Sequence, residues 1–278
     1  MRLTFLGTGT SFGVPVVGCD CPVCTSPDPR DRRTRHGSLL SLEDGRTVLV
    51  DTPPELRLQL LREGAVRVDA VWFTHVHADH LHGIDDLRIF SLRSRQSVPA
   101  FCSESAREVL RRRFEYVFSE TSDPEDATLR PEISLHTVRA GRPTVVAGRR
   151  FLPLAVPHGR QEVFGFRVGR LGYITDAKVL PPATLSALRG VHTLVLNALW
   201  WGNPHPNHFN VEEAVSAALE VGAERTFLVH LSHRVGHEDL LGRLPEGITP
   251  AYDGLTVEIP DEQDDDGLDH AQTEEMNT

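Results

Sequence analysis

The chain has 278 residues, of which 40% are hydrophobic, and this is enough for one large domain with a substantial core. Its formal net charge is −10, and no basic arm or stripe of the kind that binds nucleic acid is present, so a nucleic-acid partner is disfavoured. No run of about 18 apolar residues occurs, so we expect no membrane segment and predict a cytoplasmic protein.

The predicted elements alternate between strands and helices along the chain. Strands are predicted at 2–6, about 38–50 and 69–74, and helices at 55–63, 182–189, 211–222 and 237–244. We interpret residues 7–15, which are rich in glycine, as a tight turn near an active site. Residues 85–130 are predicted to be a mostly helical insertion, whose Phe and Val residues leave a homodimer open. Two halves of strands flanked by helices predict a four-layer αββα sandwich of the α/β class.

The two ends of the chain differ in charge. Residues 261–278 carry eight acidic residues and no Lys or Arg, and they show no periodicity. We therefore predict a single domain over residues 1–260, followed by an acidic disordered tail over 261–278.

The most informative segment follows the strand predicted at 69–74. It reads H-x-H-x-D-H, from His75 through His77 and Asp79 to His80. Four imidazole and carboxylate groups within six residues suit zinc, manganese or iron. Crowded ligands of this kind are typical of a site that holds a pair of divalent cations, so we predict a dinuclear metal site.

This motif, extended through Leu81 and His82 to Gly83, resembles the signature of the metallo-β-lactamase-fold hydrolases. The resemblance implies that His75 and His77 bind one metal ion and that Asp79 and His80 bind the other. It also implies a later His for the first ion, a bridging Asp, and a last His for the second ion.

Three residues in the second half of the chain meet these requirements. His158, Asp176 and His230 each end a short apolar run that is predicted to be a buried strand. Ligands at strand ends are held on rigid supports and can converge on one cleft. We therefore assign His158 to the first metal ion, Asp176 as the bridge, and His230 to the second metal ion.

The cysteines predict a second kind of site. Cys19, Cys21 and Cys24 form a C-x-C-x-x-C cluster, which in a cytoplasmic protein indicates metal more than disulfide. Three thiolates lack one ligand for a closed tetrahedral zinc site, and His233 is the candidate fourth ligand. Hence one structural zinc is expected, held by these four residues.

Further segments resemble the PhnP family of cyclic phosphodiesterases. They are Gly7–Ser11 with Gly13–Pro15, the cysteine cluster, Asp51–Glu55, His82–Arg88 and His205–Ala214. The resemblance implies hydrolysis of small cyclic phosphates, such as 5-phosphoribosyl 1,2-cyclic phosphate, by a hydroxide that bridges two Mn or Zn ions.

The same resemblance implies roles for three catalytic residues. His208 matches the catalytic His of the family and is expected to protonate the leaving oxygen as an imidazolium. His205 is a second candidate for this role or an orienting neighbour, and Asp79 is counted with the catalytic residues as a metal ligand. Asp51 and Asp85 are candidates for orienting the ligand imidazoles.

Other readings of the same fold stay open at this point. They are a tRNA 3′-processing nuclease, a pyrroloquinoline-quinone biosynthesis protein, a lactonase- or β-lactamase-like hydrolase, and a metal-binding scaffold without activity. The sequence does not choose between manganese, zinc and iron, and it does not fix the physiological substrate.

Overall fold

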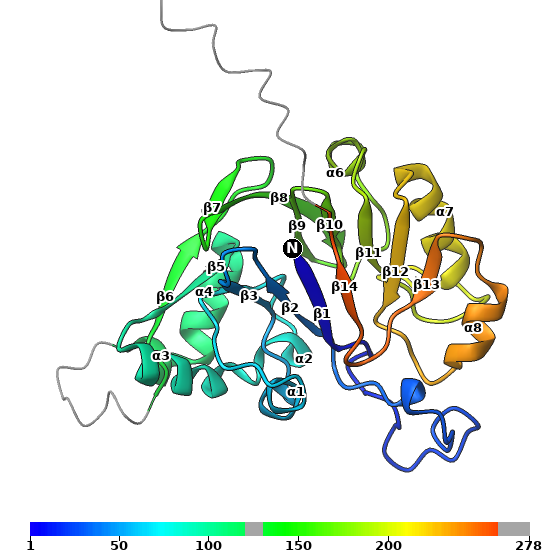
Figure 1. Cartoon of the computed structure of the whole chain (residues 1–278), viewed down its shortest axis with the longest axis horizontal. Helices are drawn as coiled ribbons and strands as arrows, with labels where there is room; N and C mark the ends of the chain where they lie inside the picture. The colour runs from blue at the N-terminus through cyan, green and yellow to red at the C-terminus, as the bar shows by residue number, and fades with distance from the viewer. Residues whose placement is uncertain (120–129, 261–278) are drawn as a thin grey trace, which may run out of the picture.

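Two seven-stranded β-sheets form the body of the protein (Figure 1). The computed structural model describes residues 1–119 and 130–260. The predicted acidic tail and the last part of the predicted helical insertion, residues 120–129, lie outside the described residues. Within the described parts of the chain, no helix is long and apolar enough to cross a membrane.

The first sheet has the strand order β14-β1-β2-β3-β4-β5-β6 and mixes antiparallel with parallel pairs. Its strands are β1 Arg2–Gly7, β2 Gly37–Ser41, β3 Thr47–Val50, β4 Ala70–Trp72, β5 Val98–Cys102, β6 Ile133–Thr137 and β14 Thr256–Glu258. Strands β3 to β6 run parallel, so their carboxyl ends lie at one edge of the sheet.

The second sheet has the order β13-β12-β11-β10-β9-β8-β7. Its strands are β7 Thr144–Val146, β8 Arg149–His158, β9 Gln161–Val168, β10 Leu171–Tyr173, β11 Thr193–Asn197, β12 Arg225–Val229 and β13 Ile248–Pro250. Strands β10 to β13 are parallel, and β8 and β9 form a long antiparallel hairpin.

Helices cover the outer face of each sheet. The first sheet carries α1 Leu56–Arg62, α2 Ala78–Leu81, α3 Arg88–Ser94, α4 Glu104–Arg113 and α5 Glu115–Phe118, and the second carries α6 Pro182–Leu188, α7 Val211–Val221 and α8 His237–Arg243. Short 3₁₀ turns occur at Pro29–Asp31 and Ile84–Leu87. Helix α7 begins with a capping box between Asn210 and Glu213 and ends at Gly222, whose φ of 74° suits the left-handed cap.

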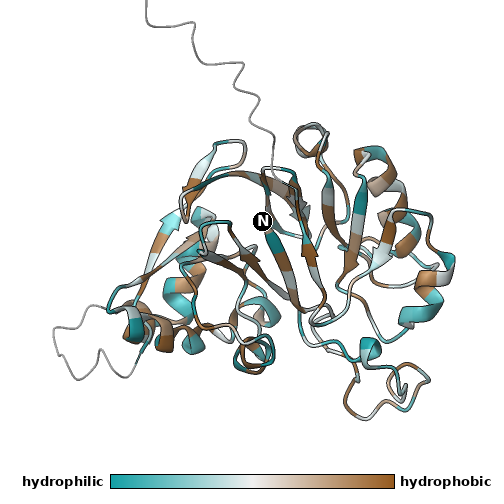
Figure 2. Ribbon diagram, viewed as in Figure 1, coloured by the Kyte–Doolittle hydropathy of each residue, from teal (hydrophilic) through white to brown (hydrophobic). Residues whose placement is uncertain are grey.

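Alternation along the strands builds the four layers. In β3 the side chains of Val48 and Val50 join the cluster between the sheets, whereas Leu49 joins the cluster under the first group of helices. In β11, Val195 faces the cluster between the sheets and Leu194 faces α6 to α8. Successive strand residues point to opposite faces, so each sheet buries both of its faces (Figure 2). The predicted αββα sandwich is thereby confirmed.

The structure corrects one sequence prediction and adds detail to another. The strand predicted over 38–50 is a hairpin of β2 and β3, because Asp44 and Gly45 form a turn in which Gly45 has a φ of 80°. The predicted helical insertion at 85–130 contains strand β5, which pairs in parallel with β4 and β6 inside the first sheet. Over its described residues the segment is mostly helical, and it also contributes one strand to the first sheet.

Candidate metal centre

The seven predicted ligands of the dinuclear site converge from both sheets. His75 and His77 follow β4, and Asp79 and His80 lie in the short helix α2 immediately after them. From the second sheet, His158 ends β8, while Asp176 follows β10 and His230 follows β12. The carboxyl ends of parallel strands meet at one edge of a sheet, which explains how residues so distant in sequence come together.

The backbone at this edge is held in an uncommon conformation. Asp51, Asp176 and His230 have φ values of 61°, 54° and 58°, in the left-handed region that non-glycine residues rarely adopt. Such conformations cost on the order of 1–3 kcal/mol each and persist where the surrounding structure enforces them, often at functional sites. All three side chains point into or directly support the cluster.

The first half of the cluster is a group of three histidines. His75 Nε2 lies 3.0 Å from His77 Nδ1, and the ligand atoms of His75, His77 and His158 all lie within 4.8 Å of one another. Burial works against protonation and holds the pKa of His75 well below its ordinary value. Neutral imidazoles in this arrangement can bind one divalent cation.

The second half combines histidine with carboxylate. His80 Nε2 lies 3.4 Å from both Asp79 Oδ2 and Asp176 Oδ2, and His230 Nε2 lies 3.3 Å from Asp176 Oδ1. Asp176 also shares a group with His75, so its carboxylate lies between the two halves. This is the position that a bridging ligand requires.

The residues fit a pair of metal ions. Among the described residues, the Nε2 atoms of His80 and His230 are buried and make no hydrogen bond. Burial acts to lower the pKa of His80, but the carboxylates of Asp176, Asp51 and Asp79 outweigh it and hold this pKa well above its ordinary value. So many buried carboxylates around one imidazole create a site that favours positive charge, as divalent cations would supply.

Hydrogen bonds at the far side of each ring fix the orientation of the ligands. His80 Nδ1 donates to Asp51 Oδ2 over 2.6 Å, and Asp51 also accepts from the amide and the hydroxyl of Thr74 at 2.8 and 2.7 Å. Thr74 Oγ1 in turn lies 3.0 Å from His75 Nδ1, and His158 Nδ1 lies 3.1 Å from the carbonyl of Asn207. These partners leave the Nε2 atoms of three ligands directed at the cluster.

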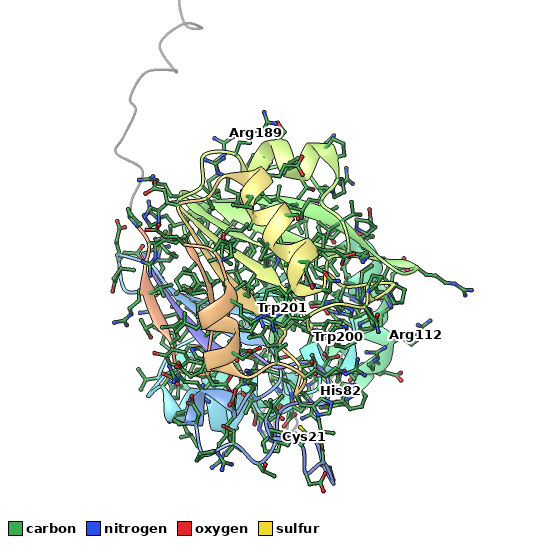
Figure 3. All side chains as sticks on the ribbon, turned by 90° about the vertical axis from the view of Figure 1, so that its right-hand side faces the viewer. Cys21, His82, Arg112, Arg189, Trp200 and Trp201 are labelled. Atoms are coloured by element: carbon green, nitrogen blue, oxygen red, sulfur yellow. The ribbon has the colours of Figure 1, made fainter. Side chains whose placement is uncertain are left out.

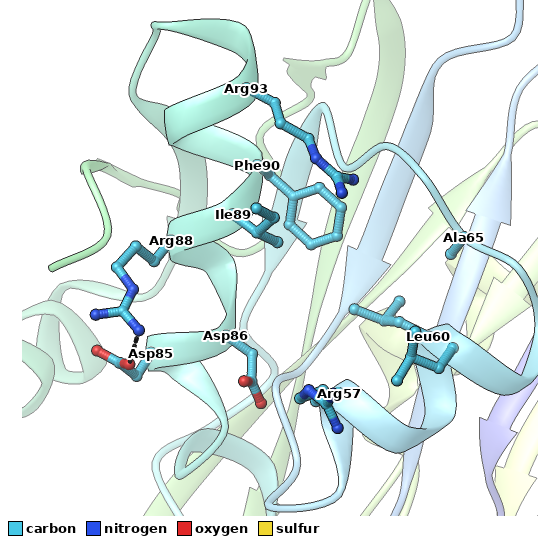
Figure 4. Close-up of a pocket in the computed structure, with 10 residues that line it drawn as sticks. Arg57, Leu60, Ala65, Asp85, Asp86, Arg88, Ile89, Phe90 and Arg93 are labelled. Atoms are coloured by element: carbon cyan, nitrogen blue, oxygen red, sulfur yellow. Dashed lines mark ion pairs between the residues drawn. The ribbon is translucent and has the colours of Figure 1, made fainter. Parts of the chain in front are cut away.

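Of the two carboxylates predicted to orient ligands, only Asp51 does so. Asp85 accepts from the Tyr116 hydroxyl at 3.2 Å and pairs with Arg88 at 3.8 Å. It lines a separate hollow of about 380 Å³ between α1 and α3, where Arg57 and Asp86 also lie (Figure 4). None of the predicted ligands or catalytic histidines lines that hollow.

His208 lies beside the bridging position. Its Nε2 is 2.9 Å from Asp176 Oδ1, and its Nδ1 is 3.1 Å from His205 Nδ1. Burial lowers the pKa of His208 to about 4, although the Asp176 carboxylate favours the protonated ring. Near pH 7 the neutral ring is therefore the main form in this environment, and the expected imidazolium is a minor species. The Asn207 amide donates to His205 Nδ1, which orients the neighbouring ring.

The predicted zinc ligands also come together. Cys19, Cys21 and Cys24 place their sulfurs 3.3, 3.5 and 3.7 Å from His233 Nδ1. A hydrogen bond from the Cys24 amide lowers the pKa of Cys21 to about 6, whereas burial raises that of Cys24 to about 11. Three sulfurs and one imidazole nitrogen form the donor set of a closed tetrahedral zinc site.

A small cavity of about 270 Å³ joins the two clusters. Its lining residues are Thr10, Ser11, Phe12, Val16, Leu199, Trp200, His205, His208, His230, Ser232, His233 and Arg234. Trp200 is one of these residues, and Figure 3 shows Trp200 and Trp201 below α7 with Cys21 farther down the same side. The sequence did not point to Phe12 or Arg234, although Arg234 directly follows the predicted ligand His233.

Known proteins share this architecture. Residues 46–231 match the family described as the β-lactamase superfamily domain. A crystal structure described as a new diphosphatase from the PhnP family is 39% identical and covers 94% of this chain and 98% of its own, with a TM-score of 0.85. Zinc-bound PqqB from Methylobacterium extorquens is 18% identical, covers 93% of this chain and 100% of its own, and has a TM-score of 0.74, so it shows the fold alone.

An octanoyltransferase from Porphyromonas gingivalis is 35% identical over 260 residues, which are 93% of this chain. The chain spans only about half of that relative, 52% of its length. The fold implies divalent metal ions and a metal-dependent hydrolase. On its family match and its 39% identical structural neighbour, this chain belongs to the β-lactamase superfamily and has the PhnP-like metallo-β-lactamase fold.

Proposed function

We propose that this protein is a dinuclear-metal phosphodiesterase that opens small cyclic phosphates, such as 5-phosphoribosyl 1,2-cyclic phosphate. The observation that carries the proposal is that the cavity opens onto the metal cluster. His230 belongs to the cluster and lines the cavity, and His208 lines the cavity and contacts Asp176 of the cluster. A phosphate at the cluster would therefore place its organic part in the cavity.

The cavity also limits the size of the substrate. Its volume of about 270 Å³ lies just below the roughly 300–1,000 Å³ that small-molecule pockets occupy. A sugar phosphate or a single nucleotide suits this space better than a folded RNA. This supports a small phosphodiester substrate over tRNA.

The chain's own residues would divide the work of hydrolysis. Two divalent cations, when bound by the seven ligands, would neutralise phosphate oxygens and acidify an attacking water. Asp176 lies between the two halves of the cluster, and Asp51 keeps His80 in the tautomer that leaves Nε2 free for a cation. The dry, buried setting strengthens each of these electrostatic contacts.

His208 would act on the leaving oxygen. Its Nε2 reaches Asp176 Oδ1 and borders the cavity, so the same atom can face an oxygen of a phosphate at the cluster. The ring would donate from its protonated form, and His205 Nδ1 lies 3.1 Å from its other nitrogen. General acid catalysis of this kind is worth about 10²–10⁴ in rate.

A diphosphate is the second candidate substrate. The reason is the 39% identical structural neighbour, which is described as a diphosphatase. Cleavage of either bond requires attack on phosphorus and departure of an oxygen. The octanoyltransferase relative gives no ground to propose acyl transfer, because this chain spans only 52% of its length.

Phosphorus NMR tests the proposal directly. Manganese-loaded protein is incubated with 5-phosphoribosyl 1,2-cyclic phosphate, with a 2′,3′-cyclic nucleotide, and with ADP-ribose as a diphosphate. We expect ring opening, about 10²–10⁴-fold slower in His208→Ala and unchanged in His136→Ala, an exposed histidine on β6. Cleavage of ADP-ribose alone would favour the diphosphatase candidate, and no cleavage of any of the three would refute the phosphodiesterase proposal.

A further inference from the structure

Arg234 has a distinctive setting in the cavity. Its guanidinium carbon lies 4.4 Å from the centre of the Trp200 ring, over the ring face. The indole is itself fixed, because its Nε1 donates to the carbonyl of Asn203 over 2.8 Å. A guanidinium held flat on an aromatic ring keeps its N–H edge available for an anion.

The charge of Arg234 is not neutralised by a neighbouring carboxylate. Among residues 1–119 and 130–260, no Asp or Glu lies within ion-pair distance of it, although it is exposed and lines the cavity. Arg243 provides the contrast: it stacks on Trp201 at 4.1 Å, but it pairs with Asp239 at 3.2 Å and is not among the cavity-lining residues. Both arginines thus stack on a tryptophan, but within the described parts of the chain only Arg234 has an unpaired charge that faces the cavity.

Phe12 forms another part of the cavity wall. Its side chain is 74% exposed, so its apolar ring is available for contact with a ligand in the cavity. It belongs to the glycine-rich segment, whose residues Thr10 and Ser11 also line the cavity. An apolar ring and a stacked cation in one small cavity suit a ligand with a carbon skeleton and an anionic group.

The segment that carries Arg234 is firmly placed relative to the metal cluster. His230, a predicted metal ligand, and His233, a predicted zinc ligand, precede it within four residues. Arg33, buried beneath, donates to the carbonyls of Ser232 and Val235 at 2.8 and 2.9 Å. The backbone of Arg234 is therefore held in a fixed position relative to the metal cluster.

We propose that Arg234, stacked on Trp200, is a specificity-determining residue that binds a second phosphate group of the substrate, distinct from the phosphate at the metal cluster. This inference rests on the proposed function and deepens it. The preferred substrates are then small phosphodiesters that carry another phosphate, such as a 5-phosphorylated sugar, and their counterparts without that phosphate are poor substrates.

The test compares two substrates that differ in one phosphate. The rates of hydrolysis of 5-phosphoribosyl 1,2-cyclic phosphate and ribose 1,2-cyclic phosphate are measured for wild type, Arg234→Gln, Arg234→Lys and the matched control Arg243→Gln. We expect Arg234→Gln to lower kcat/KM for the phosphorylated substrate about 10–100-fold, mainly through KM, which is the range for a charge-assisted hydrogen bond. The other substrate and the control variant should change less than about twofold.

Arg234→Lys keeps the charge and loses the planar stack, so it should recover part of the discrimination. An equal loss on both substrates, or no loss on either, would overturn the inference. If the wild type hydrolyses neither substrate, the proposed function fails. The phosphate subsite is then tested by calorimetry, which compares the binding of ribose 5-phosphate and of ribose to wild type and to Arg234→Gln. Discrimination that is lost in the variant supports the subsite, and equal affinity for ribose 5-phosphate in both proteins contradicts it.

Discussion

The two metal-binding clusters are built in different ways. The His/Asp cluster lies at the ends of strands, its ligands are largely buried, and Asp51, Thr74 and the Asn207 carbonyl orient its rings from behind. The Cys/His cluster lies mainly on an irregular loop, and three of its four ligands are partly exposed. Only His233 comes from another part of the chain, four residues after strand β12 ends at Val229.

From this difference we infer that the His/Asp cluster serves catalysis, whereas the Cys/His cluster stabilises the fold of its loop. Strand-end ligands with fixed partners are preorganised, so cations bound there can act on a substrate with little rearrangement. Loop cysteines have few such supports, and a zinc ion bound to them would itself hold the loop in place.

The largest effect is expected for Asp176→Asn. The substitution keeps the size of the side chain and tolerates the φ of 54°, but it removes the charge that lies between both halves of the cluster. We expect kcat/KM for a cyclic phosphate to fall about 10³-fold, with metal content reduced. Asp44→Asn, in the exposed β2–β3 turn, is the matched control. Full activity in Asp176→Asn would contradict the bridging role.

Asp51→Asn tests the support behind the cluster. Asn tolerates the φ of 61° but weakens the bond to His80 Nδ1 and leaves the other ring partners in place. Loss of such a partner typically costs 10–100-fold in metal affinity or activity. Metal titration of the variant measures this, and an unchanged affinity would show that the cluster does not depend on Asp51.

Cys21→Ser should have a smaller effect on turnover. We expect loss of the zinc, faster proteolysis of residues 16–24 and a lower Tm, while kcat/KM falls less than about tenfold, below the range for partners of catalytic metal ligands. Zinc analysis and limited proteolysis are the measurements. A loss of turnover as large as that of Asp176→Asn would mean that the loop cluster takes part in the chemistry.

His36 tests the buried layer beneath the His/Asp cluster. It lies 5.8 Å from the His80 ring, between centroids, and burial, reinforced by His80 and His230, lowers its pKa to about 3. The unfolded chain therefore takes up a proton below pH 6.5 while the folded protein does not, so the free energy of unfolding falls as pH decreases through this window.

Between pH 7.5 and pH 5.0, this single histidine should remove about 2 kcal/mol of stability. Denaturant titrations of wild type and His36→Gln at both pH values measure the difference, and turnover at pH 7.5 should change least of all the variants. An identical pH dependence in the two proteins would show that His36 is not the responsible group.

The sequence predicted most of the candidate site because its ligands end recognisable apolar strands. His158, Asp176 and His230 are each preceded by a β-rich run, and parallel strands bring such ends to one edge. The cysteine spacing likewise predicted its cluster with His233. In both cases the local sequence pattern was enough to predict which ligands come together.

What the sequence missed depends on tertiary contacts. Strand β5 is only five residues long and lies between helices, so its pairing partner is what defines it. Asp51 and Asp85 looked equivalent as supporting carboxylates, but only the fold places Asp51 against His80. Arg234 was one of 28 arginines, and its stacking on Trp200 is visible only in three dimensions.

We propose that the His/Asp cluster, and not the Cys/His cluster, carries out phosphodiester hydrolysis. The most direct test is a titration of chelator-stripped protein with manganese, in which turnover of 5-phosphoribosyl 1,2-cyclic phosphate is measured at each step in wild type and in Cys21→Ser. We predict that turnover rises in both proteins as the His/Asp cluster fills. Turnover that persists without metal, or that rises only when the cysteines are intact, would contradict the catalytic role of the His/Asp cluster.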